Sequence, residues 1–582
     1  MEALPNEILI ECFSYLDALD IFYSFDGVNS RFSKLICDIP LYIDFHLIST
    51  AKYCQICLKL LSDPEIKRQI YSLKLTNQNI YQQQIVKSAS QIDGFVHLRS
   101  LCFFNINVDI KTLWNINFST LSQLISFHMI DSFDNLYENL HTLPMSQIQN
   151  LTVPTLDASN DCLLNTFTTL TSLTLSNCLF TVLHRILKYT TNLKHLQINR
   201  LSTHMLFSGN ETIDDLVKNN PLNFLKHLTI NSYNDEFIIL ANILKRMPNL
   251  TMLTLIDYED EKLFNVDQWQ CLIRSSLTKL QTFNFTCEYS DFTDHNEIQA
   301  VFQQLQTDFW LNEHQWYTDC ILSDKFSTIY TIPYSYTSYT LPSFPDTYFN
   351  QTIDRSNPFT KVEHLEIHLN PLMYQYSCYF PYLTSIKISQ LCLDENYFNL
   401  LKTIVNFTNI NNLSIASNCK FEQPLILLEI VKQSSNLSTL SIHHDTLLPL
   451  LVDDQLCAYL SKMIKKLVLF THNIYEDFEI YGYEGDLYSI DDSIKDLYQT
   501  NKLWTVFENI EQLECTIQHQ KSIRFILGSL PKLSHVNLTL QTQDCPTELV
   551  SFAEHIALRL GMKIDVEMVL EIGINLSIWI HR

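Results

Sequence analysis

The chain has 582 residues and a mass of 68.1 kDa, which is too long for one compact core, so several domains or an extended repeat array is expected. Hydrophobic residues make up 46% and charged residues 18%, a balance that argues against wholesale disorder. The formal net charge of -24 disfavours nucleic-acid binding, because an acidic surface repels phosphate backbones.

Glycine is scarce, with eight in the whole chain, and neither G-x-G-x-x-G nor G-x-x-x-x-G-K-[ST] occurs. Loops that hold nucleotide phosphates need glycine for tight turns, so no nucleotide cofactor is expected. The first residues lack the regions of a signal peptide, and no stretch supplies the roughly 20 apolar residues that span a bilayer. The 16 cysteines follow no framework spacing. We therefore expect a cytoplasmic or nuclear protein that binds no membrane.

The first 45 residues predict three short helices. The first begins near Pro5, the second has Asp20 as its N-cap, and the third is capped by Asn29 or Ser30 and stopped by Pro40. A unit this small usually needs outside help to be stable, and it carries more apolar side chains than its interior should need. Part of its apolar surface is therefore expected to dock elsewhere.

These residues also resemble the F-box family. The ordered family motif appears here as Leu4-Pro5-Asn6-Glu7-Ile8-Leu9, Phe13-Ser14-Tyr15-Leu16, Asp20-Ile21 and Val28-Asn29-Ser30-Arg31-Phe32. Gly27 departs from the pattern, since the family tends to carry a bulkier or polar residue there. This departure should affect local helix length more than docking.

The resemblance implies binding to a Skp-type adaptor and, through it, to a cullin, as in SCF-type ubiquitin ligases. The residues that the family docks with correspond here to Leu4, Pro5, Ile8, Leu9, Leu16 and Ile21. The alternative is that the helices only cap the first repeat of the following domain. A cap, however, has no reason to reproduce the ordered motif.

From residue 70 onward one unit recurs: an apolar residue, two others, an apolar residue, one other, and an apolar residue. Examples are Leu170-Leu173-Leu175, Leu193-Leu196-Ile198 and Leu437-Leu440-Ile442. Amphipathic stretches at 180–189, 237–247 and 424–432 lie between such units and predict helices. Regular alternation of a short strand with a helix buries one continuous core in a stacked array.

This recurrence resembles leucine-rich repeats. We predict an α/β solenoid, an irregular leucine-rich-repeat horseshoe, preceded by a small three-helix F-box. The domains are the F-box at 1–45, the solenoid at 46–285 and 362–582, and an aromatic-rich insert at 286–361. Irregularity is expected because the consensus Asn or Cys after the strand survives only in places, such as Cys178 and Asn418. The alternative is a large α/β protein with a parallel sheet.

Side chains alternate along a strand, so the residues between the buried positions face the open side of the sheet. They are mostly neutral hydrogen-bonding groups and histidines, which suit the recognition of a polypeptide. An ordinary solvated sheet face would have the same composition. The candidate target-binding residues on this face are His195, Asn199, His227, Asn231, Asn284, His364, His368 and His443.

Two stretches interrupt the repeats. The insert at 286–361 is rich in aromatic residues, and alternation over 328–341 predicts strands or a hairpin. Aromatic side chains are enriched at binding hot spots, so Trp316 and Tyr336 are candidate target contacts; packing against the solenoid is the alternative. The stretch 471–500 is acidic and predicts a mobile loop, or otherwise a surface that captures a basic target segment.

The sequence contains no complete motif of catalysis or metal binding. Cys54 and Cys57 form a lone C-x-x-C, and His443-His444-Asp445 is interpreted as a polar loop. We therefore predict no catalytic residue, metal or cofactor, and no obligate homo-oligomer.

The predicted function is that of a non-catalytic subunit, a substrate-recognition adaptor of an SCF-type ubiquitin ligase that binds a protein target through its repeats. The first alternative is a protein-interaction scaffold that uses the same two surfaces without ligase function. The second is an enzyme that uses the aromatic insert as a pocket lid.

Overall fold

The computed structural model describes most of the chain, with gaps. The predicted acidic loop at 471–500, the Cys54–Cys57 pair and Asn418 lie outside the described residues. The described residues are 4–45, 63–76, 94–104, 118–130, 143–155, 167–202, 222–258, 264–289, 293–348, 358–368, 379–470, 501–540 and 546–581, apart from 17, 26–27, 38, 234–235, 323–326, 342–345, 390–391, 418, 422, 518–520 and 571–573.

The chain divides into two compact units. The first comprises Met1–Cys320 with Ser327–Thr331, and the second comprises Ile321–Phe326 with Ile332–Arg582. The predicted insert at 286–361 is thus shared between the units. Each unit is built around its own sheet, so each is described by itself.

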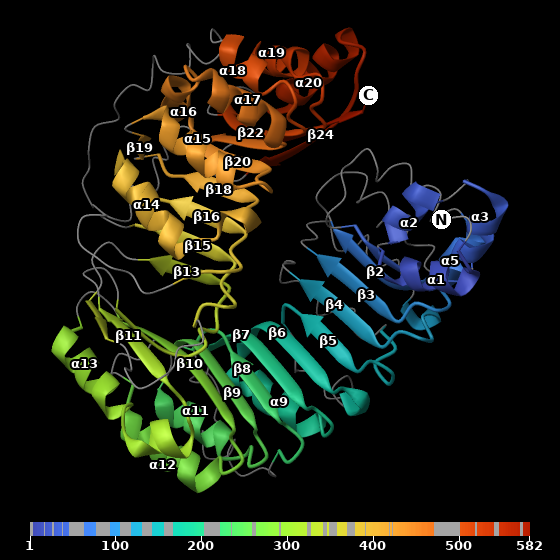
Figure 1. Ribbon diagram of the computed structural model, residues 1–582. Helices are drawn as coiled ribbons and strands as arrows, with labels where there is room; N and C mark the ends of the chain where they lie inside the picture. The colour runs from blue at the N-terminus through green and yellow to red at the C-terminus, as the bar shows by residue number, and fades with distance from the viewer. Residues whose placement is uncertain are drawn as a thin grey trace. The chain divides into compact units, whose positions relative to one another are not determined.

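The first unit begins with three helices, α1 (Asn6–Ser14), α2 (Ala18–Phe25) and α3 (Ser30–Cys37). Ten strands then follow side by side in chain order, and every neighbouring pair is parallel (Figure 1). Their bounds are β1 Leu41–Asp44, β2 Ile70–Thr76, β3 Ser100–Phe104, β4 Ser126–Ile130, β5 Asn150–Val153, β6 Ser172–Leu179, β7 His195–Ser202, β8 His227–Ile230, β9 Met252–Tyr258 and β10 Thr282–Tyr289.

Short helices connect these strands and cover one face of the sheet (Figure 1). The stretches predicted as helices at 180–189 and 237–247 form α9 and α11, so the 3.6-residue spacing of their apolar positions was a sufficient signal. The helical segments are α5 Pro64–Gln69, η2 Phe118–Thr120, η4 Phe167–Thr169, α9 Phe180–Tyr189, α11 Phe237–Leu244 and α12 Val266–Ser276.

The apolar triplets align as neighbouring rungs. Leu173 of β6 pairs in register with Leu151 of β5 and with Leu196 of β7, and all three side chains are buried. The alternation of side chains places every triplet on the helix-covered face, while the polar residues between them face the open side. The predicted leucine-rich-repeat solenoid is therefore confirmed.

After β10 the repeat pattern of the first unit ends. Helix α13 (His295–Gln304) and the π-helical turn η6 (Phe309–Glu313) lead into β11 (Thr318–Leu322) and β12 (Ser327–Thr331). Strand β12 pairs antiparallel with β10, Thr286 opposite Tyr330. The alternation at 328–341 thus does form strands, but they are not a hairpin: β12 joins the first sheet and β13 (Ser338–Leu341) joins the second.

The second unit repeats the arrangement with a new sheet. Its strands follow the order β13-β15-β16-β18-β20-β21-β22-β23, all parallel, and end on the antiparallel pair β25 and β24. The bounds of these strands after β13 are β15 His364–Ile367, β16 Ser385–Ile388, β18 Asn412–Ile415, β20 Thr439–His443, β21 Lys466–Phe470, β22 Gln512–Ile517, β23 His535–Leu540, β24 Lys563–Leu570 and β25 Ile574–His581. Strands β17 (Cys392–Leu393) and β19 (Lys420–Phe421) form a separate two-stranded sheet, and β14 (Asp346–Tyr348) belongs to the first sheet, next to β11.

Helices again cover one face of this sheet (Figure 1). The stretch predicted as a helix at 424–432 forms α15, with Pro424 in its first turn, where a missing N–H costs nothing. The helical segments are α14 Glu395–Ile404, η7 Phe407–Asn409, α15 Pro424–Gln433, α16 His444–Leu450, α17 Asp454–Met463, α18 Asn501–Val506, α19 Lys521–Ser529 and α20 Pro546–Arg559.

An asparagine directly before the first apolar residue of a triplet links successive repeats in both units. Its side-chain N–H donates to a backbone carbonyl of the preceding repeat. Among the described residues, such bonds run from Asn192 to Thr168 (2.6 Å), Asn249 to Asn223 (2.7 Å), Asn409 to Pro381 (3.1 Å) and Asn436 to Thr408 (2.8 Å). The repeat consensus predicted a polar residue after the strand, whereas this asparagine lies before it and was not predicted.

Replacing Asn436 with alanine is expected to lower the free energy of unfolding by about 1 kcal/mol, because the Thr408 carbonyl loses its side-chain donor. Urea unfolding followed by circular dichroism measures the change. Ser435→Ala, at the exposed neighbouring position, is the matched control. Equal stabilities of the two variants would show that the asparagine bond adds nothing to the stack.

Candidate functional site

The three N-terminal helices enclose a small aromatic core. The ring centroids of Phe13 and Phe25 lie 5.0 Å apart, and those of Phe25 and Phe32 lie 5.6 Å apart. Leu9 and Ile21 are only 0% and 3% exposed. Both were predicted to contact an adaptor; the structure corrects this, because side chains needed for the helices' own core offer no surface to a partner.

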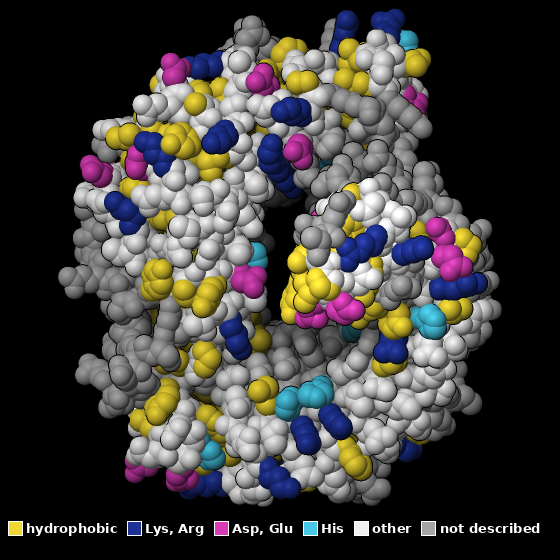
Figure 2. Space-filling view, turned by 45° about the vertical axis from the view of Figure 1, so that its right-hand side comes forward, with side chains coloured by type: hydrophobic (Ala, Val, Ile, Leu, Met, Phe, Trp, Pro, Cys, Tyr) yellow, Lys and Arg dark blue, Asp and Glu magenta, His cyan; other side chains and the backbone are white. Residues whose placement is uncertain are grey.

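The other four predicted adaptor contacts are exposed. Ile8 is 48% exposed, Leu16 40% and Leu4 37%, and Pro5 is exposed beside them in sequence. Ile10, Tyr15 and Val28 were not predicted as adaptor contacts but are also exposed in this region, and we call these seven residues the apolar head surface. Figure 2 shows hydrophobic side chains gathered on this part of the molecule.

Arg31 holds the start of the chain against the third helix. Its Nε donates to the Asn6 side chain at 2.8 Å, and a second guanidinium nitrogen donates to the Leu4 carbonyl at 2.5 Å. Asn29 in turn caps α3 by accepting from the Phe32 N–H at 2.9 Å, as predicted. Arg31 therefore positions the exposed residues from Leu4 to Asn6, a role that was not predicted for it.

On the open face of the first unit, β7 and β8 bring four predicted target-binding residues together. His195 is directly opposite His227, with ring centroids 4.5 Å apart and nearly perpendicular rings. Asn231 donates to the Asn199 side-chain oxygen at 2.9 Å. Asn284, the fifth predicted residue of this unit, lies between the buried Phe283 and Phe285 on β10 and is partly exposed on the same open side.

Lysines border this histidine pair. Lys194 and Lys226 directly precede the two strands, and the Lys226 N–H donates to the Lys194 carbonyl at 2.9 Å, so the residues occupy adjacent rungs. The pKa of His195 is lowered by burial and then by the nearby charges of His227, Lys194 and Lys226. Figure 2 shows two adjoining histidine side chains with Lys or Arg side chains beside them.

The open face of the second unit pairs its charges internally. Glu366 lies 3.3 Å from His368 and 2.9 Å from Lys387, and the hydrogen bonds from these two groups lower its pKa to about 2. His364, the start of the same strand, is exposed. The structure thus brings His364 and His368 onto one strand, with a carboxylate between them that sequence analysis had not selected.

Two other predicted target contacts prove to be interior residues. His443 is 2% exposed, because it ends β20 and caps α16 with its side chain turned inward. Trp316 is also buried, and its indole N–H donates to the Gln281 carbonyl at 3.0 Å. Both predictions are wrong as surface contacts. Tyr336 is partly exposed and lies against Tyr334, with ring centroids 5.4 Å apart.

His443, His444 and Asp445 form the one group of potential metal ligands among the described residues, their ligand atoms lying within 4.8 Å of one another. His444 Nε2 lies 2.9 Å from an Asp445 carboxylate oxygen, an ordinary ion-pair distance. His443 Nδ1 already accepts from the Asp445 backbone N–H at 3.3 Å. The cluster therefore satisfies part of its own polar groups and ties β20 to α16.

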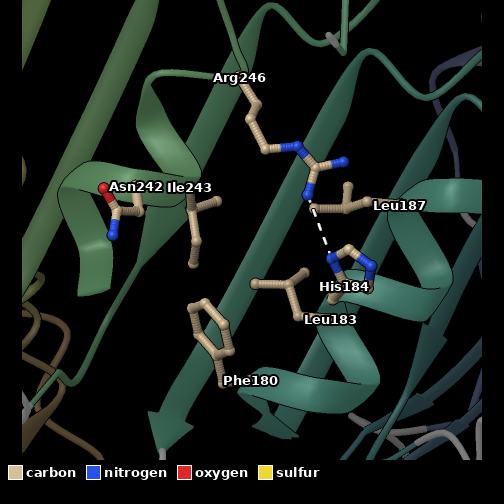
Figure 3. Close-up of a pocket in the computed structure, with 7 residues that line it drawn as sticks. All are labelled: Phe180, Leu183, His184, Leu187, Asn242, Ile243 and Arg246. Atoms are coloured by element: carbon tan, nitrogen blue, oxygen red, sulfur yellow. Dashed lines mark hydrogen bonds between the residues drawn. The ribbon is translucent and has the colours of Figure 1, made fainter. Parts of the chain in front are cut away.

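A shallow, mostly apolar cleft lies between α9 and α11 on the helix-covered side of the first unit (Figure 3). At its rim Arg246 is 3.2 Å from His184 Nδ1, and burial lowers the pKa of the Arg246 guanidinium. The remaining lining is Phe180, Leu183, Leu187, Asn242 and Ile243. Neither a carboxylate nor a nucleophilic side chain lines this cleft, so its lining does not form an acid–base pair.

No protein-family model matches the chain, and no curated protein matches it. An internalin from Listeria monocytogenes is 14% identical over 85% of this chain and 96% of its own, with a TM-score of 0.23. A chain in the Rad7 and Elc1 complex of yeast is 11% identical over 64% and 77%, with a TM-score of 0.26.

The fold is assigned from the strand register of this chain and not from these likenesses. Among the described helices, none has the length and apolar character needed to cross a membrane.

Proposed function

We propose that this chain is the target-recruiting subunit of a ubiquitin ligase, in which the N-terminal helices are an F-box that docks on a Skp-type adaptor and the repeats bind a protein target. The observation that carries the proposal is the apolar head surface. Leu4, Pro5, Ile8 and Leu16 belong to the F-box-like motif and remain exposed on or beside the first helix, while Phe13 and Leu9 are buried.

The side chains of the apolar head surface are not needed for the stability of the three helices. Phe13, Phe25 and Phe32 fill the interior together with Leu9, so the exposed side chains contribute little to folding. Burying a fully exposed leucine or isoleucine contributes about 1.5–3 kcal/mol, and Leu4, Ile8 and Leu16, which are 37%, 48% and 40% exposed, would each contribute a fraction of that. Several on one surface would therefore give a partner groove a substantial binding energy, whereas they leave unfavourable apolar area in water without one.

The repeat units supply the other half of the function. Their open faces present polar side chains on rigid parallel strands, which suits the recognition of a protein surface. In this proposal the chain contributes no catalytic group. Holding a target near the ubiquitin-carrying subunit raises its effective concentration, and transfer is accelerated by proximity alone.

Ile8→Asp in the full chain tests the docking step. A carboxylate in the middle of the apolar head surface should weaken binding to a purified Skp-type adaptor by at least about tenfold, because it removes an apolar contact and must be desolvated. The fold should be unaffected, since Ile8 is 48% exposed and lies in the first turn of α1, where the helix dipole favours an acid.

Ile238→Asp is the matched control, because Ile238 is 53% exposed on α11, far along the chain from the head. Calorimetry or biolayer interferometry gives the two affinities, and thermal melts compare the folds. Wild-type adaptor affinity in Ile8→Asp, or an equal loss in both variants, would contradict docking through the apolar head surface.

A scaffold without ligase function would use the same two surfaces, so a second measurement separates the alternatives. Cullin and ubiquitin conjugates should co-purify with the wild-type chain and be lost with Ile8→Asp. Proteins retained by both forms are bound through the repeats. Capture of the adaptor without cullin or ubiquitin conjugates would favour the scaffold.

A further inference from the structure

The open face of β7 and β8 in the first unit carries positive charge that the described part of the chain does not neutralise. We define the histidine–lysine patch as Lys194, His195, Lys226 and His227. Lys194, His195 and Lys226 are exposed, and His227 is partly exposed. Neither lysine has an ion-pair partner among the described residues. For a chain of net charge -24, this is an unusual local balance.

The second unit shows what a neutralised face looks like in the same fold. There Lys387 is paired with Glu366 at 2.9 Å, and Lys466 lies 3.5 Å from Glu514. On β7 and β8 the residues equivalent to those glutamates are neutral amides and hydroxyls, including Gln197 and Thr229. The histidine–lysine patch is therefore a site where a ligand, rather than the protein, would supply the negative charge.

Hydrogen-bonding groups beside the patch favour the same kind of ligand. The Asn199 side-chain oxygen accepts from both Asn231 at 2.9 Å and Gln197 at 3.3 Å. Among the described residues no group accepts from the side-chain N–H groups of the exposed Asn199, so they are available to a ligand on the open face. A surface of cations and amide donors complements a ligand that is rich in acceptors, such as carboxylates and backbone carbonyls.

We propose that the histidine–lysine patch, with Asn199 and Asn231, binds an acidic polypeptide segment of the target. This inference rests on the proposed function for its biological meaning and identifies the chemical class of the target. Lysine is a point charge that does not form the bidentate pairs by which arginine selects phosphate, so carboxylate side chains are the better match. A short acidic segment needs positive charge only at the patch, whereas a nucleic acid carries charge along its whole backbone and would meet the acidic remainder of a chain whose net charge is -24.

The test uses the full chain and a fluorescent Glu-Ala alternating peptide of about ten residues, which spans roughly 33 Å when extended. Lys194→Glu combined with Lys226→Glu reverses the charge of the patch. Lys245→Glu combined with Lys462→Glu changes the net charge equally at two other exposed lysines and is the matched control. Fluorescence anisotropy at low and high salt gives the affinities.

The peptide is expected to bind wild type and the control alike, to bind the patch variant at least about tenfold more weakly, and to dissociate as salt is raised. An equal loss in both variants, or tighter binding of a Lys-Ala peptide, would overturn the inference. Stronger patch-dependent binding of single-stranded oligothymidylate would overturn it in favour of nucleic acid.

Adaptor binding is measured on the same variants so that the two proposals fail separately. The patch variant should bind the Skp-type adaptor with wild-type affinity, and Ile8→Asp should bind the acidic peptide with wild-type affinity. Ile8→Asp could lose adaptor binding while the peptide shows no binding that depends on the patch. This result would support the proposed function and contradict only the inference of an acidic target.

Discussion

Replacing Trp269 with alanine is expected to lower the free energy of unfolding by about 3–5 kcal/mol. Trp269 lies on α12 and is 0% exposed. Its ring is surrounded by those of Phe237, Phe264 and Phe283 at centroid distances of 5.0, 5.7 and 4.9 Å. These neighbours belong to different elements of a stacked array, so they cannot move together to fill the cavity that alanine would leave.

Trp269→Phe should lower the free energy of unfolding by distinctly less than Trp269→Ala. Phenylalanine keeps most of the ring contacts and removes an indole N–H for which the described residues offer no acceptor, so part of the lost packing is offset. Denaturant unfolding followed by circular dichroism gives the three stabilities, with Ile238→Ala, at an exposed site, as the control. A loss of under about 1 kcal/mol in Trp269→Ala would contradict the assigned role in the core.

Acidification is expected to destabilise the second unit through His535. Burial, and then the charge of Lys466, lower the pKa of His535 from 6.5 to about 4. The ring is stacked on Trp579 of the antiparallel strand β25, with centroids 5.1 Å apart and an interplanar angle of 16°. Burial and the neighbouring lysine disfavour the imidazolium ion, so the folded protein favours the neutral form of this histidine.

The direction of the change in stability follows from the two pKa values of His535, about 4 in the folded protein and 6.5 in the unfolded chain. As the pH falls, the unfolded chain binds the proton first, so stability is full above pH 6.5 and declines as the pH falls towards about 4. Across that window the loss from this one group is at most about 3 kcal/mol. Below it the group is protonated in both states and adds no further change.

His535→Phe isolates this contribution, because it keeps the aromatic stack and removes the titration. As the pH falls from 6.5 to about 4, the free energy of unfolding of wild type should decrease relative to that of His535→Phe. Outside this window the difference between the two proteins should be constant. Glu366 titrates in a lower window, since its pKa is about 2, and it is unchanged in the variant. Parallel pH profiles for the two proteins would contradict the assignment to His535.

Much of this protein was predictable from local sequence pattern. The apolar triplets predicted the rungs, because a strand alternates its side chains and each triplet therefore has one face to bury. The stretches at 180–189, 237–247 and 424–432 became α9, α11 and α15, because helical spacing of apolar residues is likewise a local signal. Asn29 and Arg31 were visible in the motif, although only the cap could be assigned from it.

Side-chain exposure depended on the tertiary structure. Ile8 and Leu9 are neighbours in one motif, yet Ile8 is 48% exposed and Leu9 is fully buried. Trp316 and His443 were predicted as surface residues and are buried, because segments distant in sequence pack over them.

Sequence by itself therefore determined the repeating rungs, the helices between them and the motif at the start of the chain, since each of these is set by the spacing of neighbouring residues. Tertiary structure alone decided where the parallel run of the first sheet ends, with β12 pairing antiparallel with β10, and which motif residues remain for a partner. Both outcomes depend on contacts between residues far apart in the chain, and such contacts leave no periodic signal in a single sequence.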